Sequence, residues 1–247
     1  MEPLDDLVGL ARNLGRAEHD LVILAEGNCS ARDGDALWVK ASGAQMAGAG
    51  PEDFVQLSLD SVLSALDDAP IDDRAHLDAA RRDPRSPRAS TEAFMHAWLL
   101  TLPGVWFVGH THPPNLLAIL STDLGRQIAA RRLFPDEVVF CGAASCWVPY
   151  TMPGLPLALA IREAVRALSE QTQTIPTTIW LQNHGLIALG ASPNEVLNAS
   201  LMAEKAARVW RMAHRLGEMR PLTKREIDQI QDWPDEHFRR RKAGEDT

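Results

Sequence analysis

Two histidines stand one residue apart at the end of an apolar stretch. Residues 105–113 read VWFVGHTHP, so His110 and His112 close a run of β-branched and aromatic residues that ends at proline. This composition predicts a buried strand, along which residues i and i+2 point to the same side. Two imidazoles on one side form half of a divalent metal site. On these residues alone, a polar strand end bound to backbone or water remains an alternative.

A second predicted strand supplies a third histidine. Residues 178–190 read TIWLQNHGLIALG, and His184 lies where a polar turn interrupts the apolar run, directly before Gly185. Three protein ligands with an open fourth position are typical of a catalytic zinc site, whereas a structural zinc site has four ligands, usually including cysteine. The three histidines therefore favour a catalytic zinc ion.

A carboxylate precedes the first of these strands. Residues 90–100 read STEAFMHAWLL and predict a helix that Ser90 or Thr91 caps, with Glu92 in its first turn. Glu92 could serve only the helix dipole, which favours a negative charge there. It could also be a general base close to the metal, or a fourth ligand that leaves when substrate binds.

Two glycine-containing turns near the N-terminus offer groups that bind anions. Gly27 and Gly43 allow the backbone to approach a ligand closely, and the side chains of Asn28 and Ser42 can donate hydrogen bonds. Ordinary turns are the alternative on these residues alone.

Taken together, five short motifs resemble the class II aldolase/adducin family of fuculose-phosphate and rhamnulose-phosphate aldolases. They are GNCS at 27–30, ASG at 41–43, STE at 90–92, HTH at 110–112 and QNHG at 182–185. The resemblance covers roughly residues 4–217, and segments 37–43 and 148–154 are most similar to the rhamnulose-phosphate aldolase branch. One departure is Cys29, where an aliphatic residue or threonine is expected; we expect its side chain to face the core.

The resemblance implies a fold and a zinc enzyme. The fold is α/β: a single three-layer α/β/α domain over residues 1–247, with a central, mostly antiparallel sheet, a core at about 4–217 and a C-terminal helical tail at 218–247. Its zinc ligands would be His110, His112 and His184, with one Zn²⁺ per subunit and another divalent metal as the alternative, and Glu92 would be the catalytic acid/base. The matching positions for the substrate phosphate are Asn28, Ser42, Gly43, Ser90 and Thr91. Tyr150 would reach the active site of the neighbouring subunit of a cyclic homotetramer and protonate the aldehyde oxygen.

The implied reaction is reversible retro-aldol cleavage of a small phosphorylated ketose or related sugar. Relatives in the same family catalyse 4-epimerisation, dehydration or decarboxylation with the same metal, so the fold does not fix the reaction. A non-catalytic interaction module, as in adducin, is a further alternative. The three histidines together with Glu92 argue against it.

Composition limits the partners. The 247 residues carry a net charge of −8, which argues against nucleic acid as the main partner because phosphate-backbone binding needs a basic face. No apolar run of about 18 residues is present, so we expect no membrane span, and no basic start precedes an apolar core as in a signal peptide. Three cysteines imply no disulfide framework, and a reducing cytoplasm fits best.

Periodicity and turn residues predict the remaining elements. In the N-terminal half we expect a helix over 3–16, a β-hairpin with strands at 21–25 and 36–40 and a turn at Asp33-Gly34, and a solvated insertion at 48–89 with one helix at 59–66. Farther along we expect helices at 115–120 and 125–131, a strand at 137–141, a helix from 154 to 168 and a helix from 192 to about 216. A helix start capped at 223 and a frayed basic cluster at 239–242 complete the chain.

Overall fold

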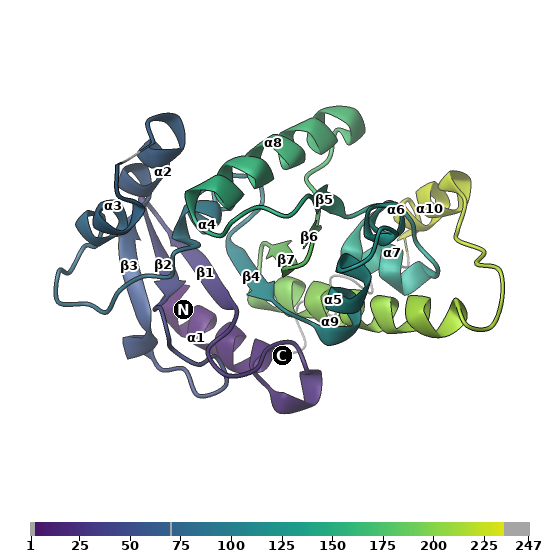
Figure 1. Ribbon diagram of the computed structural model, residues 1–247, viewed down its shortest axis with the longest axis horizontal. Helices are drawn as coiled ribbons and strands as arrows, with labels where there is room; N and C mark the ends of the chain where they lie inside the picture. Colours follow the sequence, from purple (N-terminus) through teal and green to yellow (C-terminus); the bar gives the residue numbers. More distant parts are fainter. Residues whose placement is uncertain (1–2, 70, 235–247) are drawn as a thin grey trace.

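One sheet organises the molecule (Figure 1). The computed structural model describes residues 3–69 and 71–234. Its sheet has seven strands in the order β3-β2-β1-β4-β7-β6-β5. Neighbouring strands are antiparallel except β5 and β6, which are parallel, so the expectation of a mostly antiparallel sheet is confirmed. The strands are β1 Asn28–Asp33, β2 Ala36–Lys40, β3 Phe54–Ser58, β4 Phe107–Thr111, β5 Cys146–Val148, β6 Thr178–Leu181 and β7 Gly185–Gly190.

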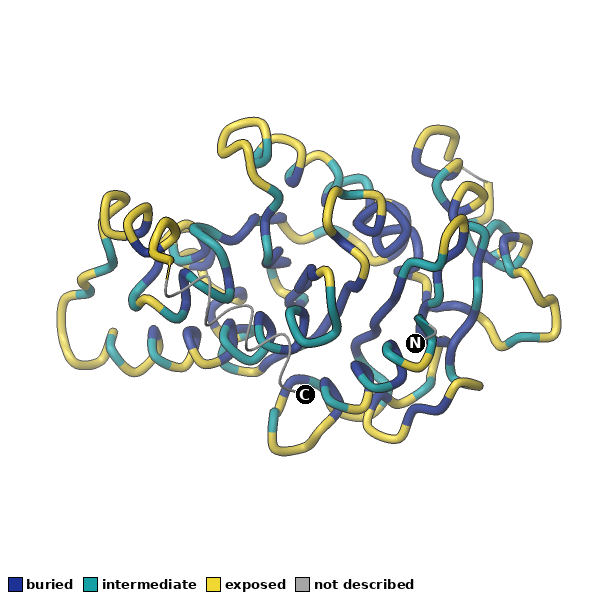
Figure 2. The backbone as a smooth tube through the Cα atoms, turned by 180° about the vertical axis from the view of Figure 1, so that it is seen from behind, coloured by how far each residue is buried: buried dark blue, intermediate teal, exposed yellow. Residues whose placement is uncertain are grey.

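Helices cover both faces of the sheet and complete three layers. On one face lie α2 Leu59–Asp67, α4 Ala93–Leu99 and α8 Leu155–Thr172, which share the largest apolar core with the strands. On the other face α1 Pro3–Leu14 and α9 Pro193–Ala213 pack on β1, β4 and β7. Seen from behind, the strands run through the buried interior while most connecting loops are exposed (Figure 2). The predicted α/β/α architecture is confirmed.

Shorter helices extend the molecule at the β5 end of the sheet (Figure 1). They are α5 Pro114–Leu120, α6 Gly125–Ala129, α7 Pro135–Cys141 and α10 Lys224–Gln231, and α3 Asp73–Ala79 lies near β3 at the opposite end. Among the described residues, no helix is long and apolar enough to cross a membrane. The basic cluster at 239–242 lies outside the described residues.

The predicted hairpin at 21–25 and 36–40 is wrong in its first strand. The strand that pairs with β2 is β1, which begins at Asn28. Residues 21–25 form a loop instead: Ile23 and Leu24 are mostly exposed, and Leu24 has a left-handed φ of 53°. The apolar residues suggested a strand, but the long-range pairing of β1 with β4 selects the polar residues that follow.

The strand predicted at 137–141 is also wrong. Val138, Val139 and Phe140 favour a strand, yet the segment is helix α7. Pro135 occupies the first turn, and the buried Glu137 carboxylate accepts a hydrogen bond from the backbone N–H of Leu133. These helix-start signals outweigh the β propensity of the three residues.

The segment at 48–89 contributes to the sheet. The predicted helix is present as α2, but β3 is an edge strand, paired with β2 over its full length. Val55 and Leu57 of β3 are fully buried. The prediction of a solvated insertion is therefore wrong for β3, a five-residue strand whose alternation of apolar and polar residues is short and directly follows the turn at Pro51–Asp53.

Candidate metal centre

The central strand β4 presents two of the predicted ligands. It lies between β1 and β7, and His110 is paired with Asn28 of β1 on one side and with Ile187 of β7 on the other. His110 is completely buried, and the His112 side chain, just beyond the strand end, is 21% exposed. Because β4 has a neighbouring strand on each side, packing fixes the orientation of the His110 ring.

A tight turn carries the third histidine to the same place. The loop between β6 and β7 has three residues, with Asn183 in the left-handed region at φ 54°, a conformation asparagine tolerates. Gly185 follows His184 at a close approach: a Cβ atom there would lie 2.5 Å from the Thr111 carbonyl oxygen and 2.6 Å from the His112 ring. Only glycine lets the turn sit against the end of β4.

Hydrogen bonds set which ring nitrogens face the centre. His110 Nδ1 lies 2.9 Å from the Leu186 carbonyl oxygen, which can only accept, so this nitrogen carries the proton. His112 Nδ1 lies 3.2 Å from a carboxylate oxygen of Glu26. Both Nε2 atoms are then free to bind a cation. A carbonyl or carboxylate behind a histidine is the usual support of a metal ligand.

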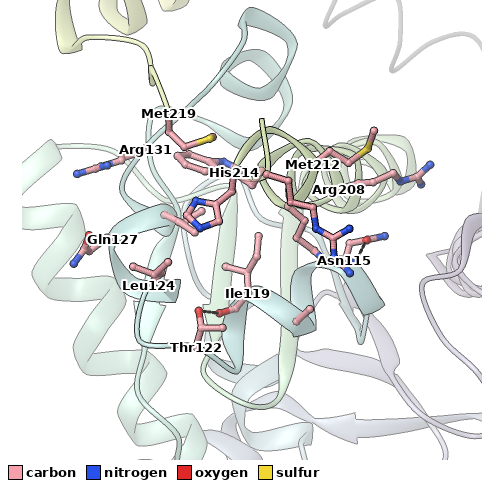
Figure 3. Close-up of a pocket in the computed structure, with 15 residues that line it drawn as sticks. Asn115, Ile119, Thr122, Leu124, Gln127, Arg131, Arg208, Met212, His214 and Met219 are labelled. Carbon is pink, nitrogen blue, oxygen red and sulfur yellow. Dashed lines mark hydrogen bonds between the residues drawn. The ribbon is translucent and has the colours of Figure 1, made fainter. Parts of the chain in front are cut away.

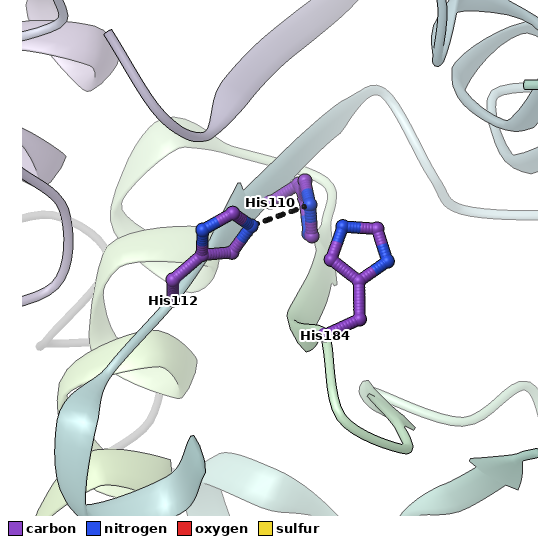
Figure 4. A group of neighbouring side chains, drawn as sticks. All are labelled: His110, His112 and His184. Carbon is purple, nitrogen blue, oxygen red and sulfur yellow. Dashed lines mark hydrogen bonds between the residues drawn. The ribbon is translucent and has the colours of Figure 1, made fainter. Parts of the chain in front are cut away.

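The three rings converge (Figure 4). One possible ligand atom from each of His110, His112 and His184 lies within 4.8 Å of the others. The Nε2 atoms of His110 and His112 are 3.1 Å apart, close to the roughly 3.3 Å expected of two nitrogens bound tetrahedrally to one zinc at about 2.0–2.1 Å. The donor set fits a divalent cation.

Burial favours the neutral, metal-binding form of His110 and His184. Burial lowers the pKa of His110 well below its ordinary value, and the neighbouring His112 and His184 lower it further. Burial also lowers the pKa of His184, against the opposing effect of Glu92. Neutral imidazoles keep a lone pair at neutral pH, which a cation requires.

Glu92 lies against these rings. Its Oε2 is 3.5 Å from His110 Nε2, and its Oε1 is 3.3 Å from His184 Nε2. The prediction that Ser90 or Thr91 caps helix α4 is wrong: Glu92 is the N-cap residue, and its carboxylate makes no capping hydrogen bond. It turns into the site because the Asn28 amide holds it there at 2.7 Å. Oε1 is buried without a hydrogen-bond partner.

The family follows from comparison with known proteins. Residues 5–211 match the model of the Class II Aldolase and Adducin N-terminal domain. This chain belongs to the class II aldolase and adducin family. The N-terminal class II aldolase domain of a conserved protein from Thermoplasma acidophilum is 26% identical, with a TM-score of 0.67 over 84% of this chain and 93% of that one. An L-fuculose 1-phosphate aldolase, 17% identical, has a similar fold, with a TM-score of 0.71 over 92% of this chain and 93% of that one.

A curated relative is much longer. The uncharacterized oxidoreductase YuxG of Bacillus subtilis (strain 168) is 31% identical over 162 residues, which are 64% of this chain and 21% of that protein. This chain therefore spans about a fifth of the length of that relative.

A chain of buried hydrogen bonds, the His96 relay, links Ser30, His96 and Asn28 to Glu92. His96 Nε2 is bonded to Asn28 Oδ1, and its Nδ1 lies 2.7 Å from the Ser30 hydroxyl. An amide oxygen can only accept, so Nε2 carries the proton and Nδ1 accepts from Ser30. Burial lowers the His96 pKa to about 3, so the ring is neutral. Because Asn28 Oδ1 accepts the proton of His96 Nε2, the amide nitrogen of Asn28 is the end that faces Glu92.

Sequence reasoning assigned no role to Glu26 or to the His96 and Ser30 pair. Both histidine partners lie more than 60 residues away along the chain, and no local spacing marks them. A polar residue in an otherwise apolar helix, as His96 is in α4, is the one signal that could have been followed.

The residues predicted to bind the substrate phosphate differ in how accessible they are. The Ser90 hydroxyl accepts from the Asn28 amide at 3.2 Å and from the Glu92 backbone N–H at 3.3 Å. Ser42 and Thr91 are exposed, and Gly43 has a φ of 82° with open space around its Cα. Both N–H groups of Asn28 are engaged, by Ser90 and Glu92, so Asn28 would reach an anion only by giving up one of them.

Tyr150 is displayed on the surface. It follows β5 in the loop before α8 and is 55% exposed. Its backbone N–H donates to Gln182 Oε1 at 3.1 Å, beside the turn that holds His184. Its hydroxyl makes one hydrogen bond within the described residues, to the Met152 sulfur at 3.5 Å.

The cysteines take no part in the site. Cys29, Cys141 and Cys146 are buried and unpaired, and Cys29 packs in a core cluster as expected. Burial raises the pKa of each thiol to about 12, so none is a thiolate at neutral pH.

Proposed function

We propose that this chain is a zinc-dependent carbon–carbon lyase that cleaves a small phosphorylated ketose by a retro-aldol reaction. The observation that carries the proposal is the placement of Glu92: a buried carboxylate with one unpartnered oxygen beside three convergent imidazoles. A carboxylate in that place can move a proton at a carbon next to a carbonyl, which is the demand of an aldol reaction.

The zinc site would be formed by His110, His112 and His184. Three histidines with an open position suit zinc, and the Leu186 carbonyl and Glu26 orient two of them. When bound, a divalent cation would polarise the substrate carbonyl and stabilise negative charge that develops on its oxygen.

Glu92 is the proton carrier in this proposal, and Oε1 is the atom that carries the proton. Oε2 is occupied by the Asn28 amide, whereas Oε1 has no hydrogen-bond partner among the described residues. In cleavage, the hydroxyl of the departing carbon loses its proton to solvent as its oxygen becomes the aldehyde oxygen, and the bond between that carbon and the carbonyl-side carbon breaks. The electron pair remains on the carbonyl side. Glu92, which has taken up a proton from solvent beforehand, gives that proton to the carbonyl-side carbon. In condensation the same oxygen removes the proton.

The substrate phosphate would bind Ser42, Gly43, Ser90 and Thr91, with Asn28 shared between phosphate and Glu92. Ser42 and Thr91 are exposed, and no heavy atom beyond its chain neighbours lies within 4 Å of where a Cβ of Gly43 would be, so a ligand can approach the backbone there. Lys40 is buried and donates to the carbonyls of Ala25 and Ala41, so it holds the loops around this region together. We place the protein in the cytoplasm, consistent with its three unpaired thiols.

The reaction is tested with a panel of ketose 1-phosphates and sugar-acid phosphates. We expect metal-loaded protein to release an aldehyde from at least one ketose phosphate and Glu92→Gln to lower turnover by roughly 100-fold or more while metal content is kept. Conversion of a panel sugar into a stereoisomer without aldehyde would replace the lyase by an epimerase. A dehydrated or decarboxylated product would indicate those reactions.

A non-catalytic module, as in adducin, predicts a different result. Protein purified without metal, and inactive on the whole panel after zinc is added, would support the module and contradict the lyase.

A further inference from the structure

A second cavity lies apart from the histidines. It has a volume of about 520 Å³ and opens between α5, α6 and the C-terminal part of α9 (Figure 3). None of its lining residues belongs to the proposed metal or phosphate sites. Its volume is within the roughly 300–1,000 Å³ of small-molecule sites.

The walls of this cavity are mainly apolar. Ile119, Ile128 and Trp210 form part of them, and Leu124 and Met212 are 46% and 62% exposed beside it. Two large apolar side chains exposed at one cavity leave a surface that an apolar ligand would cover favourably. A sugar phosphate has no such apolar part, so the proposed substrate is a poor match.

Every charged side chain that lines the cavity is an arginine. Four arginines and His214 line it, and no aspartate or glutamate does, in a chain of net charge −8. The arginines are Arg131, Arg208, Arg211 and Arg215. Figure 3 shows Arg131 and Arg208 at opposite sides of the opening.

Over residues 3–69 and 71–234, no ion pair includes any of these four guanidinium groups. The buried Glu204 carboxylate accepts a hydrogen bond at the start of α5, from the backbone N–H of Leu116 at 3.1 Å. Burial raises the pKa of Glu204, and the charge of Arg208 lowers it, so Arg208 does interact with this carboxylate although the two form no ion pair. Arg211 donates to the neutral amide oxygen of Asn115.

We infer that this cavity binds a small organic anion with an apolar body, of the aromatic or aliphatic carboxylate or sulfonate class. The apolar body would cover Ile119, Leu124 and Met212. The anionic group would lie at the edge, where an arginine can hold it with two parallel N–H donors. This site is separate from the proposed catalytic centre and does not depend on it.

The test uses the fluorescent probe 8-anilinonaphthalene-1-sulfonate with the full-length, metal-loaded protein. We expect one saturable site per subunit. Ala118→Trp, which fills the opening from an exposed position on α5, and Arg211→Gln should each weaken binding by roughly tenfold. The control is Arg85→Gln, whose side chain is 91% exposed elsewhere, and it should bind as the unaltered protein does. Neutral N-phenyl-1-naphthylamine should bind at least tenfold more weakly.

Several outcomes would overturn the inference. They are equal binding of the neutral and anionic probes, binding insensitive to both Ala118→Trp and Arg211→Gln, and absence of saturable binding. A change of subunit number in Ala118→Trp without probe binding to the unaltered protein would mark the cavity as an interface between copies. His184→Ala should keep probe binding, which separates failure of this site from failure of the proposed catalysis.

Discussion

At the residue scale, the site depends on the partners behind its functional groups. Three imidazoles could be present without forming a metal site if their protons pointed inward. The Leu186 carbonyl and the Glu26 carboxylate draw the Nδ1 protons of His110 and His112 outward. Asn28 holds one oxygen of Glu92 and leaves the other unpartnered.

Removing Glu26 should weaken the metal site without removing a ligand. We expect Glu26→Ala to lower zinc affinity by roughly 10- to 100-fold, because His112 loses the group that orients it. Competition with a chromophoric chelator measures the affinity. Glu52→Ala, at an exposed position in the turn before β3, is the matched control, and equal affinities in both variants would contradict this role.

His96 should make stability depend on pH in a definite range. Its pKa is about 3 in the folded protein because the ring is buried, against an ordinary value of 6.5. Between these values the unfolded chain binds a proton that the folded chain does not. The free energy of unfolding should therefore fall as pH falls from about 6.5 toward 3, by at most about 1.4 kcal/mol per pH unit, and be unaffected by this group above that range.

Denaturant unfolding of His96→Gln isolates this contribution. Glutamine can still bond Ser30 and Asn28 but does not titrate, so we expect a shallower decline of stability toward acid pH than in the unaltered protein. Identical slopes in the two proteins between pH 6.5 and 4 would show that His96 is not held neutral.

At the scale of elements, helices and strands with clear local patterns were predicted correctly, whereas strands selected by long-range pairing were not. The strands around His110 and His184 were predicted because their apolar runs end at glycine, proline or a polar turn. Helix α9 was predicted from its N-cap serine, which accepts from the Glu195 backbone N–H. Strand β1 was misplaced, because its polar sequence is selected by pairing with β4 rather than by its own composition.

For the site, too, local sequence patterns could be predicted and long-range contacts could not. The types and spacing of the three histidines indicated a metal, and the structure brings them together. The hydrogen bond between His96 and Ser30 could not be predicted, since the two residues lie 66 positions apart and meet only in the folded chain. The helix start at Pro135 and Glu137 could have been predicted from the local sequence, but Val138 and Val139 favour a strand, and a strand was predicted there.

The turn between β6 and β7 is an element whose shape can be tested. Gly185→Ala would place a methyl group 2.5 Å from the Thr111 carbonyl oxygen, so the turn must move. We expect a loss of roughly 1–3 kcal/mol in the free energy of unfolding and weaker zinc binding through His184. Gly9→Ala, in helix α1 with open space around it, should be neutral or stabilising by about 0.5–1 kcal/mol. Similar effects of the two substitutions would contradict the close approach.

At the scale of the whole molecule, large apolar side chains remain exposed in two loops. Ile23 and Leu24 are 62% and 79% exposed, and Tyr150 and Met152 are 55% and 63% exposed. Such residues are suited to contacts between subunits. We propose a homotetramer in which Tyr150 reaches the active site of a neighbour, because its hydroxyl makes no hydrogen bond to a proposed catalytic group among the described residues of its own chain.

Complementation tests the shared site. Tyr150→Phe removes only a hydroxyl, so turnover should fall by roughly tenfold or more while zinc content and subunit number are kept. Mixed oligomers of Tyr150→Phe and His184→Ala chains should regain activity, since some sites then combine an intact tyrosine with intact ligands. Full activity of Tyr150→Phe, or inactive mixtures, would place the active site within one chain.

The most direct test of the central claim is the metal content of the purified protein and its histidine variants, measured by inductively coupled plasma mass spectrometry. We expect about one divalent ion, zinc, per subunit, and loss of most of it in each of His110→Ala, His112→Ala and His184→Ala. His214→Ala, exposed at the end of α9, should keep the metal. A metal content unchanged in all three ligand variants would contradict the site, and with it the proposed chemistry.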